Sequence, residues 1–162
     1  MEEEMVYTEA EAERFFAIKH NNLTWELLEK AQRTPVEDGL MVHAAHSSCM
    51  HWLQAGTPAH HQRGEWLLAR VYSELGYPKA ALRHARLCLE LTETHIDLMQ
   101  DFDRAYAYEA LARASALAGD MQAATDNYKL AQQAGDEIAN EEDKKIFMGD
   151  LQSGDWHGFK IG

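Results

Sequence analysis

Apolar residues recur along this chain at the three- and four-residue spacing of amphipathic helices rather than at the alternate spacing of strands. The pattern predicts helices near residues 8–20, 23–33, 36–55, 58–75, 78–93, 101–118, 121–138 and 141–151. Short turns join most of them, and short turns place neighbouring helices antiparallel. Longer irregular segments are expected at 94–100 and in the tail from Ser153. The sequence therefore predicts an all-α fold, a superhelix or solenoid of antiparallel helix pairs.

Helix starts and stops support these boundaries. Thr8 with Glu11 forms a capping box, and Thr34 with Glu37 forms a second one in which Pro35 takes the first helical position. Prolines also open the segments that begin at 58 and 78. Glycines follow four of the apolar-periodic stretches, where we expect a left-handed residue to end the helix. These glycines are Gly56, Gly76, Gly119 and Gly135.

The second half of the chain contains an internal repeat. Shifted by 43 residues, Gly76 falls on Gly119 and Cys88 falls on Ala131. The same shift superimposes Leu68-Ala69-Arg70 on Leu111-Ala112-Arg113, and Ala80-Ala81 on Ala123-Ala124. Small and apolar residues at these positions allow the two helices of a hairpin to approach closely, and the glycine suits the end of the first helix. We therefore expect two similar helical hairpins in tandem.

This repeat resembles the tetratricopeptide repeat. The second copy carries the resemblance in Tyr108, Leu111, Ala112, Gly119, Asp120, Met121, Ala124, Tyr128 and Ala131, and the first copy carries it in Leu68, Ala69, Tyr72, Gly76, Ala81 and Cys88. A tetratricopeptide repeat has about 34 residues, so the extra residues near 93–100 imply a longer second helix or a wider turn. The whole chain, with stretches such as 62–66 and 101–109, also looks like bacterial tetratricopeptide-like proteins of uncharacterised function.

A chain of 162 residues fits one domain, and we expect a single helical domain over residues 1–162, of which the resemblance covers roughly 58–138. N-terminal helices occupy 1–57, two tetratricopeptide-like hairpins occupy 58–138, and a capping helix and tail occupy 139–162. In this family the first helices of successive hairpins line a concave groove that holds an extended peptide or a partner helix. The groove-facing positions here are Arg63, Trp66, Arg70 and Glu74 in one hairpin and Tyr106, Glu109, Arg113 and Leu117 in the next.

Six of these residues form the candidate ligand site: Arg63, Trp66, Arg70, Tyr106, Glu109 and Arg113. Arg70 and Arg113 occupy equivalent positions, so their guanidinium groups are expected to face the same ligand carboxylates. Trp66 and Tyr106 are suited to act as aromatic anchors. The resemblance thus implies a protein or peptide ligand that is acidic or ends in a free carboxylate.

The same residues have a purely structural interpretation. Arg70 with Glu74, and Glu109 with Arg113, stand four residues apart, and such pairs on an exposed helix contribute roughly 0.2–0.5 kcal/mol each. Trp66 fits a core position as well as a groove position. The sequence leaves both interpretations open.

Charge narrows the class of partner. The chain of 162 residues has a formal charge of −12, which repels the phosphates of nucleic acids and anionic lipids. No apolar run approaches the roughly 20 residues that a membrane span requires. The acidic start Met1-Glu2-Glu3-Glu4 is the reverse of a basic signal-peptide n-region. We expect a cytoplasmic location and a partner that is neither nucleic acid nor membrane.

Histidine is unusually frequent, with nine residues in the chain. Five of them, His43, His46, His51, His60 and His61, lie in two adjacent predicted helices. His43 and His46 are three residues apart on one helix face, a spacing that can hold one metal ion. However, no acid follows on the next turn and no His-Glu-x-x-His motif occurs. Polar or core histidines are the simpler interpretation, so no metal or other cofactor is predicted.

Motifs of catalysis are not found either. The sequence has no glycine-rich phosphate loop and no Gly-x-Ser-x-Gly elbow. Cys49 and Cys88 fall within amphipathic helical patterns, where a free thiol acts as a small apolar group and no disulfide is expected. We therefore expect a binding protein rather than an enzyme.

The last helix, over 141–151, is expected to cover the exposed apolar edge of the stack. Trp156 and Phe159 follow in a tail for which two arrangements remain open: the tail folds back on its own chain, or it docks into the groove of a second chain and makes a homodimer. The main hypothesis is a protein- or peptide-binding adaptor or scaffold. The alternatives are a structural homo-oligomer with a self-filled groove and a protein that binds a metal or small molecule at its histidine-rich helix pair.

Overall fold

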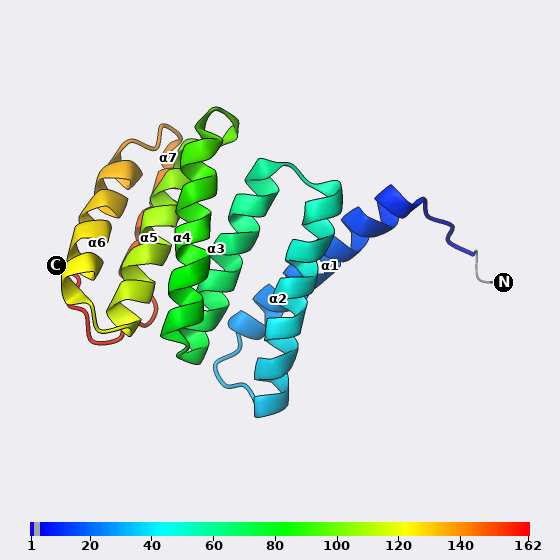
Figure 1. Ribbon diagram of the computed structural model, residues 1–162, viewed down its shortest axis with the longest axis horizontal. Coiled ribbons are helices and arrows are strands. Elements are labelled where there is room, and N and C mark those ends of the chain that lie inside the picture. Colours follow the sequence, from blue (N-terminus) through cyan, green and yellow to red (C-terminus); the bar gives the residue numbers. More distant parts are fainter. Residues whose placement is uncertain (2–3) are drawn as a thin grey trace.

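The computed structural model describes residue 1 and residues 4–162. Within these residues the chain forms seven α-helices and one 3-10 helix and no strand, which confirms the all-α prediction (Figure 1). The bounds are α1 Glu9–Leu28, α2 Pro35–Ala55, α3 Pro58–Leu75, α4 Pro78–Thr94, η1 Ile96–Leu98, α5 Asp101–Leu117, α6 Met121–Asp136 and α7 Glu141–Gln152. Glu2 and Glu3 of the acidic start lie outside the described residues.

The N-terminal region differs from the prediction. We expected two helices, over 8–20 and 23–33, whereas the structure has the single helix α1, which ends at Leu28. No glycine or proline interrupts this stretch. The hydroxyl of Thr24 donates to the carbonyl of His20 at 2.7 Å, so this polar side chain bonds within the helix rather than capping a new one.

The predicted capping boxes are confirmed. Thr8 Oγ1 accepts from the amide of Glu11 at 3.2 Å, and the Glu11 carboxylate accepts from the amide of Thr8 at 2.8 Å. The box at the start of α2 has the same two bonds. At the start of α3 a histidine takes the role of the glutamate, because His60 Nδ1 accepts from the amide of Thr57 at 3.0 Å.

The four predicted glycine stops have three different outcomes. Gly76 and Gly119 follow the ends of α3 and α5 with φ of +79° and +81°, so these two left-handed positions are confirmed. Gly56 follows α2 but has an extended backbone, with φ of −99°. The stop at Gly135 is wrong, because this residue lies inside α6. A β-carbon there would stand 2.6 Å from the ring of Phe147, so the glycine permits the close approach of α7.

The helices pack as consecutive pairs. α1 packs on α2, α3 on α4 and α5 on α6, and each pair contacts the next, which gives a solenoid-like stack (Figure 1). Residues that the 43-residue shift superimposes occupy equivalent buried positions in α3–α4 and α5–α6. They are Leu68 with Leu111, Ala69 with Ala112, Ala81 with Ala124, and Cys88 with Ala131. The extra residues between the two hairpins form η1 and its flanks, so the wider turn is the alternative that the structure has.

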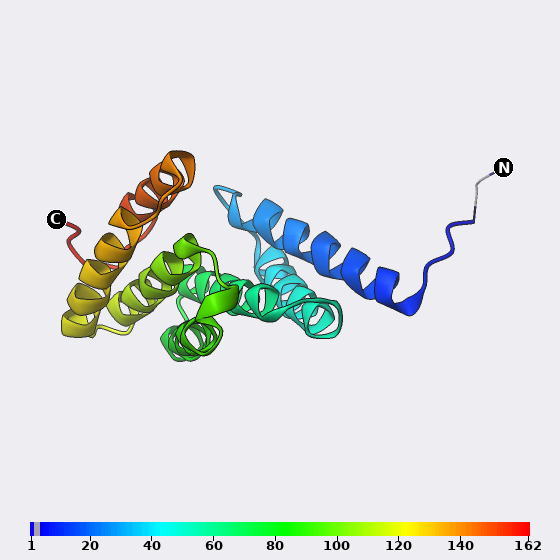
Figure 2. The same cartoon turned by 90° about the horizontal axis from the view of Figure 1, so that it is seen from above.

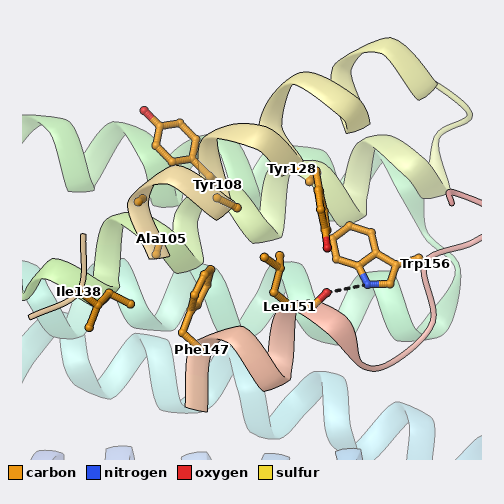
Figure 3. Close-up of a cluster of buried hydrophobic side chains, with 10 residues drawn as sticks. Ala105, Tyr108, Tyr128, Ile138, Phe147, Leu151 and Trp156 are labelled. Carbon is orange, nitrogen blue, oxygen red and sulfur yellow. Dashed lines mark hydrogen bonds between the residues drawn. The ribbon is translucent and has the colours of Figure 1, made fainter. Parts of the chain in front are cut away.

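Four helices shape a concave face. Seen from above, α3 and α5 lie in the middle, while α1 rises at one end and α7 at the other (Figure 2). α7 packs on α5 and α6 through a cluster that contains Phe147, Leu151 and Trp156 (Figure 3). None of the helices in the described part of the chain is both long and apolar enough to cross a bilayer.

Candidate functional site

A cavity of about 370 Å³ opens on the concave face, and we call it the aromatic pocket. Four helices, α1, α3, α5 and α7, contribute to its wall. The lining residues are Asn21, Trp25, Gln62, Arg63, Trp66, Leu67, Phe102, Asp103, Tyr106 and Asp150. The volume lies at the lower end of the range that small ligands and side-chain anchors occupy in proteins.

Aromatic rings form much of the wall. The rings of Trp25 and Trp66 stack with centroids 5.8 Å apart at 23°, which joins α1 to α3. Tyr106 of α5 stands edge-on to Trp66, with centroids 5.4 Å apart at 75°. These contacts hold the rings in fixed mutual positions, and rigid aromatic side chains lose little conformational entropy when a ligand binds.

One arginine of the pocket is already paired. Arg63 donates from Nε and Nη2 to the two carboxylate oxygens of Asp103, at 2.9 and 3.0 Å. This bidentate bond raises the pKa of Arg63 above its ordinary value. Asp103 also accepts from the amide of Gln100 at the start of α5. The Arg63 guanidinium lies 5.4 Å from the ring centre of Phe102, so the pocket already holds one cation against an aromatic ring.

Gln62 brings a buried polar group to the pocket wall. Its Nε2 donates to Thr92 Oγ1 and to the carbonyl of Asp103, both at 3.0 Å. Thr92 gives its own hydroxyl proton to the carbonyl of Cys88 at 2.7 Å, so it must accept from Gln62, and the orientation of the amide is fixed. Gln62 Oε1 is buried and has no hydrogen-bond partner among the described residues. A residue of the pocket wall thus contains a buried acceptor without a donor.

Tyr106 and Asp150 close the pocket on the α7 side. The Tyr106 hydroxyl donates to Asp150 Oδ2 at 2.5 Å. Burial, and then this bond to a carboxylate, raise the pKa of Tyr106 above its ordinary value, so the phenol remains a donor. The bond fixes the position of the carboxylate at the rim of the pocket.

The other half of the predicted site is a buried charge cluster. Glu109 Oε2 accepts from the indole nitrogen of Trp66 at 3.0 Å, and Glu109 Oε1 accepts from Arg113 Nε at 2.7 Å. Arg70 reaches the same carboxylate at 3.9 Å, whereas Glu74 faces Arg33 at 3.8 Å instead of pairing with Arg70. The local pair of Glu109 with Arg113 is therefore present, but it is buried rather than on an exposed helix surface.

The C-terminal tail covers this cluster. The Arg113 guanidinium donates to the carbonyls of Ser153, Asp155 and Asp150 at 3.1, 3.0 and 3.3 Å. It lies 4.1 Å from the ring centre of Trp156, whose indole nitrogen donates to the carbonyl of Leu151 (Figure 3). The tail thus folds back on its own chain, the first of the two arrangements that the sequence left open. Burial lowers the pKa of Arg113 from its ordinary value, and Glu109 opposes this effect.

The structure therefore divides the six predicted site residues. Arg63, Trp66 and Tyr106 line the open aromatic pocket. Arg70, Glu109 and Arg113 lie together under the tail, where the Arg113 donors serve the chain's own carbonyls. The two arginines do not share one open ligand surface as their equivalent positions in the repeat had implied.

Sequence reasoning missed several pocket residues. Trp25 was assigned to a separate short helix, although a large aromatic residue in the polar stretch 21–26 is a signal that could have identified it. Phe102 and Asp103 lie in the stretch 101–109 that contributes to the family resemblance, but no binding role was predicted for them. Asp150 carries no local signal, because its position depends on how α7 folds back over α5.

The histidines of α2 and α3 are used in local contacts. Four of the five have a polar partner: His46 with the Tyr72 hydroxyl at 2.8 Å, His51 with Glu13 at 2.5 Å, His60 with the Thr57 amide at 3.0 Å and His61 with the Trp52 carbonyl at 3.0 Å. Both metal candidates, His43 and His46, are exposed on α2. Within residues 1 and 4–162, no group of three or more histidine, cysteine or acidic side chains is arranged to hold a metal ion.

The two cysteines are free thiols in the packing of the helices. Burial raises the pKa of Cys49 to about 12 and raises that of Cys88 well above its ordinary value. Gly64 of α3 packs against Cys49, where a β-carbon would stand 2.9 Å from the sulfur. Neither thiol is set up as a nucleophile.

The chain matches no protein-family model, no curated protein and no solved structure.

Proposed function

We propose that this chain is a protein- or peptide-binding adaptor or scaffold and that it holds its partner on the concave face, with one partner side chain in the aromatic pocket. In this proposal the chain acts in the cytoplasm, without catalysis and without a cofactor. The tetratricopeptide-like repeat of the sequence is part of the same hypothesis. The observation that carries it is the aromatic pocket itself, a cavity of about 370 Å³ walled by α1, α3, α5 and α7.

The composition of the wall supports this function. Tryptophan, tyrosine and arginine are the residues that most often dominate binding energy at protein interfaces, and the pocket contains Trp25, Trp66, Tyr106 and Arg63. Trp25 remains partly exposed although it is a large indole, which leaves apolar surface for a partner to cover. A concave site between helices is also a common place for ligands in helical proteins.

A peptide-display selection tests the proposal. A library of random peptides is selected on the immobilised full chain, and enriched peptides are then measured against Trp25→Ala and against Trp52→Ala. Trp52 is a matched control, because it does not line the pocket and its ring stacks on that of His60, with ring centroids 4.1 Å apart. We expect micromolar peptides whose affinity falls at least about tenfold with Trp25→Ala, the loss of one aromatic anchor, and stays unchanged with Trp52→Ala.

Two results would contradict this function. Selection that enriches no peptide above a denatured-chain control would remove the binding hypothesis. Enriched peptides that bind Trp25→Ala as tightly as the original chain would move the binding surface away from the pocket. Thermal melts of both variants show whether either substitution unfolds the chain.

Self-association is a second candidate, favoured by one specific observation. The region where α1 begins exposes Tyr7, Phe15, Phe16 and Ile18, at the end of the stack opposite α7 (Figure 2). Exposed apolar patches of this kind often mark interfaces. Light scattering over a range of protein concentrations tests this candidate. A homodimer through this end is supported if the mass of the original chain rises toward that of a dimer while Phe15→Glu remains a monomer. A constant monomer mass of the original chain would exclude it.

A further inference from the structure

The charges of the aromatic pocket do not balance. Two carboxylates and one guanidinium line it, and the charge of the Arg63 guanidinium is balanced by Asp103 through a bidentate bond. The remaining carboxylate, Asp150, accepts a bond from the neutral hydroxyl of Tyr106. No lysine, arginine or histidine in the described part of the chain forms an ion pair with Asp150. One negative charge at the rim therefore lacks a cation.

The position of Asp150 makes this charge more notable. It lies in the last turn of α7, where the partial negative charge of the helix end disfavours a carboxylate by a few tenths of a kcal/mol or more. The hydrogen bond from Tyr106 holds the carboxylate at the pocket rather than leaving it to turn into solvent. This exposed carboxylate is held at the rim of the pocket and is free to pair with a cation of a ligand.

The rings of the pocket suit a cation. The faces of indole and phenol rings attract positive charge, and tryptophan attracts it most strongly. The pocket already shows this chemistry, since Arg63 lies 5.4 Å from the ring centre of Phe102. Trp25, Trp66 and Tyr106 offer further rings in fixed positions. An aromatic wall with a carboxylate at its rim is a general way to bind an ammonium or guanidinium group.

The polar atoms of the wall point to a donor-rich ligand. Gln62 of the wall adds a buried side-chain acceptor without a partner, although this oxygen is not itself exposed at the pocket surface. Asp150 is a second acceptor with capacity beyond its bond from Tyr106. Acceptors in excess of donors favour a ligand that carries several N–H groups, as lysine and arginine side chains do.

The wider field has the same sign. The chain has a formal charge of −12. Burial is the main cause that raises the pKa of Tyr106, and the carboxylates of Asp150, Glu109 and Asp143 add to it. Such a field draws cationic partners toward the groove and repels acidic ones.

We propose that the aromatic pocket binds a basic side chain, a lysine or an arginine, presented by the partner peptide. This inference rests on the proposed function and specifies the chemistry of the partner. It replaces the acidic or carboxylate-terminated peptide that the repeat had implied, because Arg113 donates to the carbonyls of the tail and the charge of Arg63 is already balanced by the carboxylate of Asp103. The side chain enters between α1 and α7, with its charge at Asp150 and its methylene groups against the indoles of Trp25 and Trp66.

The test uses lysine capped at both ends, so that its side chain carries the only charge. Capped lysine is titrated into the ¹⁵N-labelled full chain, and the four tryptophan indole N–H signals are followed by NMR after assignment with Trp→Phe variants. We expect the signals of Trp25 and Trp66 to move, with a dissociation constant on the order of 1 mM for a single side chain, while that of Trp52 stays in place. Capped arginine should act in the same way. Capped norleucine, which has a similar shape without the charge, should bind at least about fivefold more weakly, since it loses the cation–π and carboxylate contacts.

Matched variants isolate the carboxylate. Asp150→Asn keeps an acceptor for Tyr106 and removes the charge, and it should weaken capped lysine about fivefold with little effect on norleucine. Asp97→Asn removes an exposed charge in η1, outside the pocket, and should leave the titration unchanged. Added salt should weaken lysine more than norleucine.

Each other result overturns the inference. Norleucine that binds as tightly as lysine would show a purely apolar pocket, and glutamate that moves the same indole signals would show the opposite charge preference. No movement of these signals up to about 50 mM capped lysine would exclude a side-chain site of useful strength. If the display selection still yields peptides that depend on Trp25, the proposed function stands, but the pocket binds a group other than a basic side chain. If that selection also fails, the proposed function falls as well.

Discussion

The indole nitrogen of Trp66 lies 3.0 Å from Glu109 Oε2 and joins α3 to α5 beneath the concave face. The other oxygen of this carboxylate accepts from Arg113 Nε at 2.7 Å and lies 3.9 Å from the Arg70 guanidinium. Glu109 is only 2% exposed, so its charge is compensated by these neighbours and not by water. A single buried carboxylate thus connects the aromatic pocket to the cluster that holds the tail.

Replacing this carboxylate should cost much of the stability of the chain. Glu109→Gln leaves the buried Arg113 without its counter-charge, and removal of one member of a buried ion pair typically costs about 3–5 kcal/mol. Denaturant unfolding followed by circular dichroism measures the loss. Glu90→Gln, which neutralises an exposed acid on α4, is the control and should change the free energy of unfolding by less than about 0.5 kcal/mol. Equal effects of the two variants would show that the cluster around Glu109 is not structural.

Gly154 fixes the path of the tail for two separable reasons. It has φ of +78°, and a β-carbon at this position would stand 3.0 Å from Arg113 Nη1 and 3.1 Å from Arg70 Nη2. Gly158 has φ of +85° but would place its β-carbon in open space. Gly158→Ala should therefore lower the free energy of unfolding by about 1 kcal/mol, because of the backbone conformation alone. Gly154→Ala should lower it by about another 1 kcal/mol, because its β-carbon also approaches the two guanidinium groups. The difference in stability between the two variants, taken from their melting curves, measures the effect of the close approach. Equal losses of stability in the two variants would argue against a tail packed on both guanidinium groups.

The arrangement of the helices was largely accessible from the sequence. Capping boxes at Thr8 and Thr34 and left-handed glycines at Gly76 and Gly119 mark boundaries through local hydrogen bonds, so local patterns identify them. One error fell where a tertiary contact decides the outcome. Gly135 resembles a helix stop in sequence, yet it continues α6 because Phe147 packs against it.

The site was harder to predict from the sequence than the helices, because α7 and the tail cover the last hairpin of the stack. The repeat makes Arg70 and Arg113 equivalent, but only Arg113 is covered by α7 and the tail, since these elements follow the second hairpin and not the first. Equivalence in a repeat predicts the packing between neighbouring hairpins, as at Ala81 and Ala124, and cannot predict what covers the last one.

Both thiols should resist alkylation in the folded chain. Cys49 has a pKa raised to about 12 by burial, and Cys88 is inaccessible. Because the thiolate is the reactive form, iodoacetamide at pH 8 should label the native chain at least about 100-fold more slowly than the urea-unfolded chain. Mass spectrometry of time points measures both rates. Rapid labelling of Cys49 in the native chain would show that α2 and α3 separate more readily than their packing at Gly64 indicates.

His60 makes the start of α3 sensitive to pH. Its Nδ1 accepts from the amide of Thr57 only when the ring nitrogen is unprotonated. Burial lowers the pKa of His60 from its ordinary value of 6.5, and Arg63 and Arg14 lower it further. The unfolded chain therefore binds the proton more readily than the folded chain does. The stability that His60 contributes is fully present above pH 6.5 and is lost as the pH falls through that value toward the lower folded pKa.

Exchange of His60 for glutamate should remove this sensitivity while keeping the cap. Glutamate is the usual capping-box partner of threonine, and it stays ionised between pH 7 and 5.5. We expect His60→Glu to reduce the fall in unfolding free energy over this range by about 0.3–0.5 kcal/mol, a modest figure because solvent screens a partly exposed group. His43→Glu places the same side chain on an exposed position of α2 without a cap and should leave that fall unchanged. An identical pH dependence in the original chain and in both variants would assign the acid sensitivity to other histidines, such as His20 and His46, whose pKa values burial also lowers.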